Sequence, residues 1–195
     1  MSQIMNVLIT GVGGQGTLLA SRIIAQVAVD LGYDVKVTEV HGMAQRGGSV
    51  VSEVRYGEKV YSPTIPKGQA DVLLAFEKLE AARWLDYLKP DGIVIINDER
   101  VDPLPVMSGK VKYPEDIIDR ISQLKPKTTV ADATQTAIEC GNVKAANVVL
   151  VGILSKVIGL PPEKVEEAIR KLVPPKALEV NLAAFRRGVD WSVHQ

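Results

Sequence analysis

Cysteine and histidine are almost absent from this sequence. Its 195 residues include one cysteine, Cys140, and two histidines, His41 and His194. A single thiol cannot form an intramolecular disulfide. An iron–sulfur cluster usually needs four cysteine thiolates, and a structural zinc site combines several Cys and His ligands. We therefore expect no metal or cluster held by this chain alone, and any electron transfer through clusters must take place in a partner.

The sequence also lacks an excess of charge and a long apolar run. Its 23 basic and 23 acidic residues cancel, so it offers neither the basic face that nucleic acid requires nor a polybasic handle for a membrane. No apolar stretch reaches the roughly 20 residues that cross a bilayer. The first residues are polar and lead directly into a strand, unlike a signal peptide. We expect a cytoplasmic protein with no nucleic acid and no membrane partner.

Short apolar segments alternate with helical periodicity along most of the chain. Strands are predicted at residues 5–10, 35–40, 71–76, 93–97 and 128–131, and helices at 17–31, 77–88, 115–124, 142–158, from 161, and 176–187. This order predicts an α/β fold with a doubly wound, mostly parallel, Rossmann-like sheet. Residues 49–56 alternate apolar and polar side chains, and with a return strand at 59–62 they predict an antiparallel hairpin at the sheet edge.

The remaining segments complete this prediction. Residues 89–92 are predicted to form a turn, and the proline-rich residues 98–114 an irregular loop. At 195 residues the chain suits one domain, 1–195. Its residues 141–195 form a helical extension that packs on the sheet or on a partner.

The first strand ends in the sequence Gly11-Val12-Gly13-Gly14-Gln15-Gly16, here called the glycine loop (residues 11–16). Its glycines match G-x-G-x-x-G, which lets an anion approach the amides at a helix start. Glu39, at the end of the second strand, could accept a hydrogen bond from a ribose hydroxyl. The loop therefore predicts a site for a phosphate or another anion, of which a dinucleotide is one case, or glycines that serve only a tight turn and close packing. The amide of Gln15 could reach a ligand or a partner.

A second glycine segment (residues 41–49, H-G-M-A-Q-R-G-G-S) follows the second strand directly. Because loops at the carboxyl ends of neighbouring strands share one edge of an open sheet, we expect it beside the glycine loop. Arg46 offers a fork of donors to a carboxylate or phosphate. Alternatively, the segment is a bend in which Arg46 pairs with Glu39 or another carboxylate. Asn142 and Asn147, at the start of an apolar helix, are either helix caps or ligands.

The two motifs together resemble those of a known protein family. G-V-G-G-Q-G after the first strand and E-V-H-G-M-A-Q-R-G-G-S-V after the second, with A-A-N-V-V-L-V-G near the end, resemble the gamma-type domain of 2-oxoacid:ferredoxin oxidoreductases. The Q-R-G-G form favours the indolepyruvate branch. The resemblance covers nearly the whole chain.

The resemblance implies a heteromeric enzyme whose large alpha subunit binds thiamine diphosphate and the [4Fe–4S] clusters. That enzyme converts an arylpyruvate, coenzyme A and oxidised ferredoxin to an aryl-acetyl-CoA, carbon dioxide and reduced ferredoxin. The small subunit would be inactive alone and would contribute no catalytic residue.

The site expected on this chain binds coenzyme A phosphates or shapes the arylpyruvate pocket, or is purely an interface with the large subunit. Its predicted residues are Gly11, Gly13, Gly14, Gln15, Gly16, Arg46, Gly47 and Gly48. Two other functions stay open: a free-standing nicotinamide- or flavin-dependent oxidoreductase, and a non-catalytic scaffold of the same fold.

Overall fold

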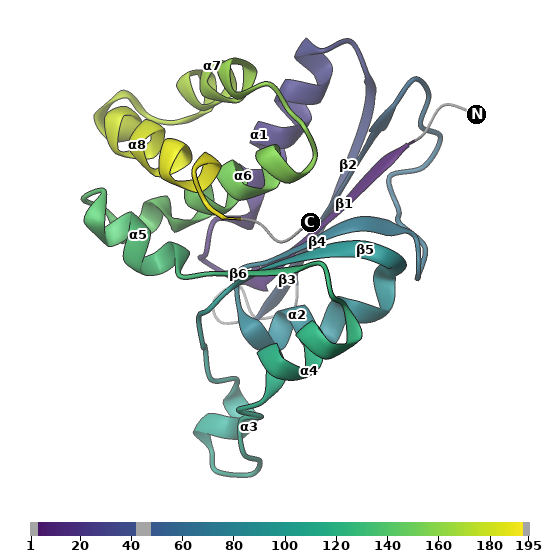
Figure 1. Cartoon of the computed structure of the whole chain (residues 1–195), viewed down its shortest axis with the longest axis vertical. Coiled ribbons are helices and arrows are strands. Elements are labelled where there is room, and N and C mark those ends of the chain that lie inside the picture. The colour runs from purple at the N-terminus through teal and green to yellow at the C-terminus, as the bar shows by residue number, and fades with distance from the viewer. Residues whose placement is uncertain (1–3, 42–47, 193–195) are drawn as a thin grey trace.

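The computed structural model describes residues 4–41 and 48–192, which form helices around one six-stranded sheet (Figure 1). The strand order is β2-β3-β1-β4-β5-β6. Strands β1 (Met5–Val12), β4 (Ala70–Ala75), β5 (Leu88–Asn97) and β6 (Thr128–Ala131) run parallel to one another. Strand β3 (Ser49–Gly57) runs antiparallel to both β1 and β2 (Asp34–His41). The predicted α/β class with a mostly parallel sheet is confirmed.

The antiparallel pair at the sheet edge is made by β2 and β3, so the predicted return strand at residues 59–62 is wrong. Those residues are not a strand. Arg55 holds the segment that follows β3 by donating from Nη1 to the backbone oxygens of Ser62 and Thr64, at 2.9 and 2.8 Å. The short connection from β2 makes β3 its antiparallel neighbour, because only a long crossover can join adjacent parallel strands. As a result β3 separates β2 from β1.

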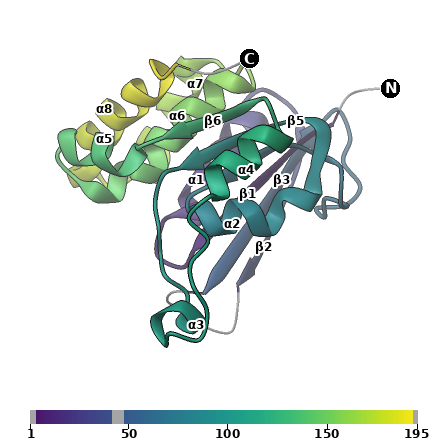
Figure 2. The same ribbon diagram turned by 60° about the horizontal axis from the view of Figure 1, so that its bottom comes forward.

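Helices cover both faces of the sheet (Figures 1 and 2). One face carries α1 (Thr17–Asp30) together with α5 (Ala133–Glu139), α6 (Ala146–Val157), α7 (Pro162–Leu172) and α8 (Leu178–Val189). The other face carries α2 (Lys78–Trp84) and α4 (Ile117–Leu124). Single 3-10 turns lie at Leu85–Tyr87, Val143–Ala145 and Pro175–Ala177. None of the helices within residues 4–41 and 48–192 is long and apolar enough to cross a membrane.

Three local features differ from the prediction. The predicted loop at 98–114 contains the short helix α3 (Leu104–Met107), which projects away from the sheet (Figure 2). Helix α5 was not predicted. The predicted turn at 89–92 lies inside β5, where the pairing with β4 shifts register. This shift absorbs the extra residues without ending the strand, as a β-bulge does.

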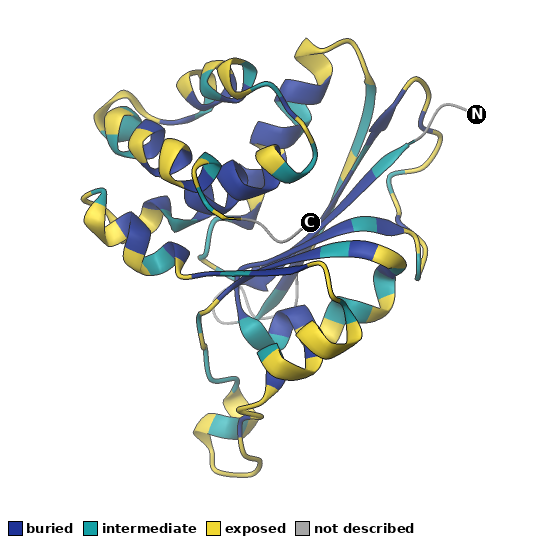
Figure 3. Cartoon of the chain, in the orientation of Figure 1, coloured by how far each residue is buried: buried dark blue, intermediate teal, exposed yellow. Residues whose placement is uncertain are grey.

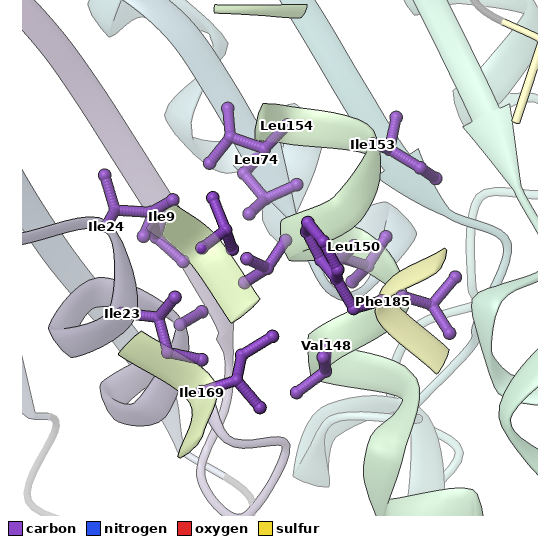
Figure 4. Packing of buried hydrophobic residues seen from close by; sticks show 14 of the residues in the cluster. Ile9, Ile23, Ile24, Leu74, Val148, Leu150, Ile153, Leu154, Ile169 and Phe185 are labelled. Atoms are coloured by element: carbon purple, nitrogen blue, oxygen red, sulfur yellow. The ribbon is translucent and has the colours of Figure 1, made fainter. Parts of the chain in front are cut away.

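Helix α6 lies at the centre of the larger hydrophobic core. Its residues from Asn147 to Ser155 are all buried, and Figure 3 shows this helix dark along most of its length. Leu150 and Leu154 of α6 meet Leu74 of the sheet, Ile169 of α7 and Phe185 of α8 in one cluster (Figure 4). The carboxyl-terminal helices therefore pack on the chain's own sheet, which places the start of α6 beside the glycine loop.

A cleft at the carboxyl ends of the strands

The carboxyl ends of β1, β4 and β5 border a cleft of about 670 Å³. Ligands of open α/β sheets bind at this edge, where loops from several strands meet. Polar and small residues from both halves of the chain line it: Gly14, Gln15, Gly16, Asn97, Glu99, Thr134, Asn142, Lys144, Asn147, Lys176 and Asn181. Leu19, Phe76 and Val173 contribute apolar surface. The cleft thus contains half of the glycine loop and a set of residues that its motif does not include.

The glycine loop needs glycine for its backbone path. Gly14 and Gly16 have φ of 106° and 89°, in the left-handed region that side chains disfavour. A Cβ on Gly11 would lie 2.9 Å from Cβ of Phe76 and 3.0 Å from Cγ2 of Thr17. One on Gly16 would lie 2.3 Å from Nδ2 of Asn147. At these positions the glycines are therefore needed for a tight turn and for close packing. The close packing brings the start of α1 to the cleft.

Gln15 fastens the loop to the end of β4. Its Oε1 accepts a hydrogen bond from the backbone N–H of Val12 at 2.7 Å, and its Nε2 donates to the backbone oxygen of Phe76 at 3.2 Å. The side-chain amide expected to reach a ligand or partner is thus largely used within the chain. One N–H of Nε2 remains for another acceptor.

The second glycine segment ends beside the glycine loop, as predicted. The backbone N–H of Gly13 donates to the backbone oxygen of Gly48 at 2.9 Å. Ser49, the next residue, donates from Oγ to Oε2 of the buried Glu80 at 2.5 Å, and Glu80 also pairs with Arg83. The start of β3 is therefore fixed beside the glycine loop at this edge of the sheet. Arg46 and Gly47 lie outside the described residues.

Glu39 does not occupy the ribose position of a dinucleotide fold. It pairs in register with Ser52 of β3 and is not among the residues that line the cleft. The reason is the inserted strand: in a dinucleotide fold the second strand lies next to the first, whereas here β3 separates them. The expectation that placed Glu39 near the glycine loop depended on that adjacency.

A hydrogen-bonded network that the motifs did not predict runs from β5 to α5. Asn97, the last residue of β5, donates from Nδ2 to Oε2 of Glu99 at 2.9 Å and accepts at Oδ1 from the backbone N–H of Ala133 at 2.9 Å. Thr134 donates from Oγ1 to the same oxygen of Glu99 at 2.6 Å. The carboxylate of Glu99 is therefore held in one position on the cleft wall. Its place just after a strand was the one sequence signal that could have identified it.

Two lysines add positive charge to the cleft. Lys144 and Lys176 are exposed, and neither makes a hydrogen bond or ion pair from its ammonium group within the described part of the chain. Asn142 is a helix cap, since its Oδ1 accepts from the backbone N–H of Lys144 at 3.0 Å. Helix α1 begins at Thr17, and its N-cap Gly16 provides no side-chain cap, so the first N–H groups and the dipole of α1 are directed to this region. The cleft can therefore attract an anion.

Asn147 joins the two halves of the site. It is 5% exposed, and its Nδ2 donates to the backbone oxygen of Gly16 at 3.4 Å. Its Oδ1 is buried and has no hydrogen-bond partner within residues 4–41 and 48–192. Buried acceptors usually have partners, so such a group is a mark of a functional region. Asn147 is therefore not a cap of α6, whose N-cap is Ala145, and its side chain instead contacts the glycine loop.

These residues can bind a ligand, but they do not form a recognisable catalytic group. Across the described residues, no cluster of three His, Cys, Asp or Glu side chains could hold a metal ion. Fold and cleft together define an α/β protein with a mostly parallel sheet and a glycine loop at the start of its first helix.

Comparison with known proteins identifies the family. The sequence profile of the pyruvate ferredoxin/flavodoxin oxidoreductase family matches residues 6–191, and the chain belongs to this family. It is 47% identical to indolepyruvate oxidoreductase subunit IorB of Pyrococcus horikoshii, with 94% of each chain covered. It is 44% identical to the IorB subunit of Thermococcus kodakarensis, again over 94% of each.

The fold agrees with this family. The gamma subunit of a keto/oxoacid ferredoxin oxidoreductase from Geobacter sulfurreducens superposes with a TM-score of 0.72 at 25% identity, covering 95% of this chain and 94% of that one. The resemblance drawn from the two glycine motifs is confirmed. The chain is therefore a member of an oxidoreductase family, and each of the relatives named above is a subunit.

Proposed function

We propose that this chain is the small subunit of an indolepyruvate-type 2-oxoacid:ferredoxin oxidoreductase. The observation that carries the proposal is the similarity to the two archaeal IorB subunits, which extends over nearly the full length of both chains. The complete enzyme would convert an arylpyruvate, coenzyme A and two oxidised ferredoxins to an aryl-acetyl-CoA, carbon dioxide and two reduced ferredoxins. The chain's single cysteine suits a reducing compartment, so the proposal places the enzyme in the cytoplasm.

The roles of the two subunits in this proposal are those that the family resemblance implies, and the single cysteine of this chain agrees with them. A large alpha subunit would hold thiamine diphosphate, which supplies the electron sink for decarboxylation, and the [4Fe–4S] clusters. One cysteine cannot ligate a cluster on this chain. The small subunit would therefore bind and position a substrate at the edge of the partner's active site.

Within the complex, we assign coenzyme A phosphates to the cleft. Three features support this assignment: the uncapped start of α1, the glycine loop, and the two lysines without partners in the described part of the chain. Backbone N–H groups and ammonium groups are suitable donors to phosphate oxygens. Arg46, Gly47 and Gly48 would add contacts from the second glycine segment. In the rival account both segments are only an interface with the large subunit.

Activity of the separate and combined subunits tests the assignment to a heteromeric enzyme. The chain alone should show no oxidation of indolepyruvate, with or without NAD. With the large subunit of the same organism, activity should appear and should depend on thiamine diphosphate, coenzyme A and ferredoxin. Activity of the isolated chain with NAD would instead support a free-standing oxidoreductase. Comparing the rates with indolepyruvate, pyruvate and 2-oxoglutarate as the substrate tests whether the enzyme belongs to the indolepyruvate branch of the family.

Substitution of the cations tests the coenzyme A assignment. Because a hydrogen bond to a charged group contributes about 1.5–3 kcal/mol, Arg46→Ala, Lys144→Ala or Lys176→Ala should each raise the KM for coenzyme A about tenfold or more. The subunits should still co-elute. Lys110→Ala, at an exposed lysine outside the cleft, is the matched control. Loss of assembly with an unchanged KM in the residual complex would favour the interface account.

A further inference from the structure

We propose that Glu99 is a specificity-determining residue of the cleft, and that its carboxylate accepts a hydrogen bond from the ribose or adenine of a nucleotide-containing ligand. This inference rests on the proposed function, because it takes coenzyme A as the ligand. It concerns a residue that neither glycine motif includes.

The position of Glu99 is set by its neighbours. Asn97 and Thr134 both donate to Oε2, at 2.9 and 2.6 Å, and the backbone N–H of Glu99 donates to the backbone oxygen of Asn97 at 2.7 Å. The backbone oxygen of Glu99 accepts from the N–H of Lys78 at 3.1 Å. Both the main chain and one carboxylate oxygen are therefore fixed before any ligand arrives, which lowers the entropic cost of binding.

The other carboxylate oxygen is available to a ligand. No described residue hydrogen-bonds to Oε1 of Glu99, and within residues 4–41 and 48–192 no cation lies in ion-pair distance of this carboxylate. The residue is half-buried on the cleft wall. A half-buried carboxylate that is held by neutral donors, and not by a cation, keeps its full capacity to accept from a hydroxyl or amino group.

The charge of Glu99 limits what can bind beside it. A carboxylate repels a phosphate in its neighbourhood, whereas the start of α1, Lys144 and Lys176 attract one. Phosphates are therefore directed to the basic part of the cleft, and a group with a hydrogen-bond donor is directed to Glu99. In coenzyme A, the free ribose 2′-hydroxyl and the adenine amino group are donors bound covalently close to phosphates. The pantetheine arm is then left to extend toward the partner subunit.

Inhibition and saturation kinetics of the assembled complex test this assignment. Adenosine 3′,5′-bisphosphate probes the nucleotide alone, and pantetheine probes the arm alone. Glu99→Gln, which replaces one acceptor oxygen by a donor amide, should raise the KM for coenzyme A and the inhibition constant of the bisphosphate about tenfold. The kcat at saturating coenzyme A and the inhibition constant of pantetheine should change little. Glu163→Gln, at an exposed glutamate on α7, is the matched control.

Variants of Thr134 show whether the hydrogen bond to Oε2 positions the carboxylate. Thr134→Val should raise the KM for coenzyme A in the same direction by a smaller factor, and Thr134→Ser should restore it. A merely structural defect would lower kcat and the melting temperature together without this rescue.

Several results would overturn the inference. The inference fails if the bisphosphate does not inhibit the wild-type complex, or if Glu99→Gln leaves the KM for coenzyme A unchanged. It also fails if Glu99→Gln raises the inhibition constant of pantetheine as much as that of the bisphosphate. If the lysine variants weaken coenzyme A binding and Glu99→Gln does not, only the role of Glu99 fails. If the lysine variants have no effect either, the proposed coenzyme A site fails as well.

Discussion

Replacing Gly16 with alanine tests the contact between the glycine loop and α6. Gly14 and Gly16 both have left-handed φ values, 106° and 89°. An alanine in this region loses about 1–2 kcal/mol. Around Gly14 a Cβ would meet nothing within 4 Å, whereas at Gly16 it would lie 2.3 Å from Nδ2 of Asn147. The two positions therefore share the backbone penalty and differ in packing.

The expected losses follow from these two terms. Gly14→Ala should reduce the free energy of unfolding by about 1–2 kcal/mol. Gly16→Ala adds the overpacking of a buried site, about 1–3 kcal/mol, for a total of about 2–5 kcal/mol. Asn147 is 5% exposed, so its side chain has little space into which it could move.

A double-mutant cycle with Asn147→Ala separates the terms. Removing the asparagine side chain should relieve the clash, so Gly16→Ala should cost about 1–3 kcal/mol less in the Asn147→Ala background. Urea unfolding of the full chain, followed by circular dichroism, measures each free energy. The reasoning is refuted if Gly16→Ala costs no more than Gly14→Ala, or if the cycle shows no coupling.

Two further predictions concern the core and the sheet. Gly188→Ala should lower the free energy of unfolding by about 1–3 kcal/mol despite the higher helix propensity of alanine, because its Cβ would lie 2.1 Å from the backbone oxygen of Val149. Thermal unfolding of Gly188→Ala, compared with the control Arg187→Ala at an exposed neighbouring position, measures this loss. Equal melting temperatures of the two variants would contradict the prediction. Burial raises the pKa of the Glu53 carboxyl on β3. The stability linked to its protonation is therefore present below its unfolded pKa of about 4.3 and is lost as the pH rises through the folded value. Glu53→Gln should gain stability relative to wild type between about pH 4 and pH 7. Urea unfolding at several pH values measures the difference in free energy of unfolding between Glu53→Gln and wild type. If this difference stays constant across the range, the pKa of the Glu53 carboxyl is not shifted by folding.

Local sequence patterns predicted most of the secondary structure correctly. The predicted bounds of the short strand β6 agree with the observed ones, and the predicted end of α1 lies within one residue of the observed end. The prediction failed where tertiary context decides. Residues 89–92 carry strong turn signals, yet pairing with β4 keeps them in β5 as a register shift. Short amphipathic elements such as α5 give too weak a periodicity to detect.

The candidate site was predicted in part. The glycine loop was identified because a run of glycines after a strand has a direct conformational meaning. Glu39 was proposed from the spacing of a dinucleotide fold, but β3 lies between β1 and β2 and removes the adjacency on which that spacing depends. Glu99, Lys144 and Lys176 belong to no motif, and they line the cleft only because the chain folds them there.

The sequence by itself determined the alternation of strands and helices, the glycine turn at the start of α1, and the family. These properties depend on residue type and on spacing over a few positions, which local steric and hydrophobic preferences fix. Only the tertiary structure decided the strand order, the packing of α6 and α8 on the sheet, and the joining of residues 14–16 with Glu99 and Lys176 in one cleft. Contacts between residues so far apart along the chain depend on how whole elements bury their apolar faces, and no short segment of sequence encodes that choice.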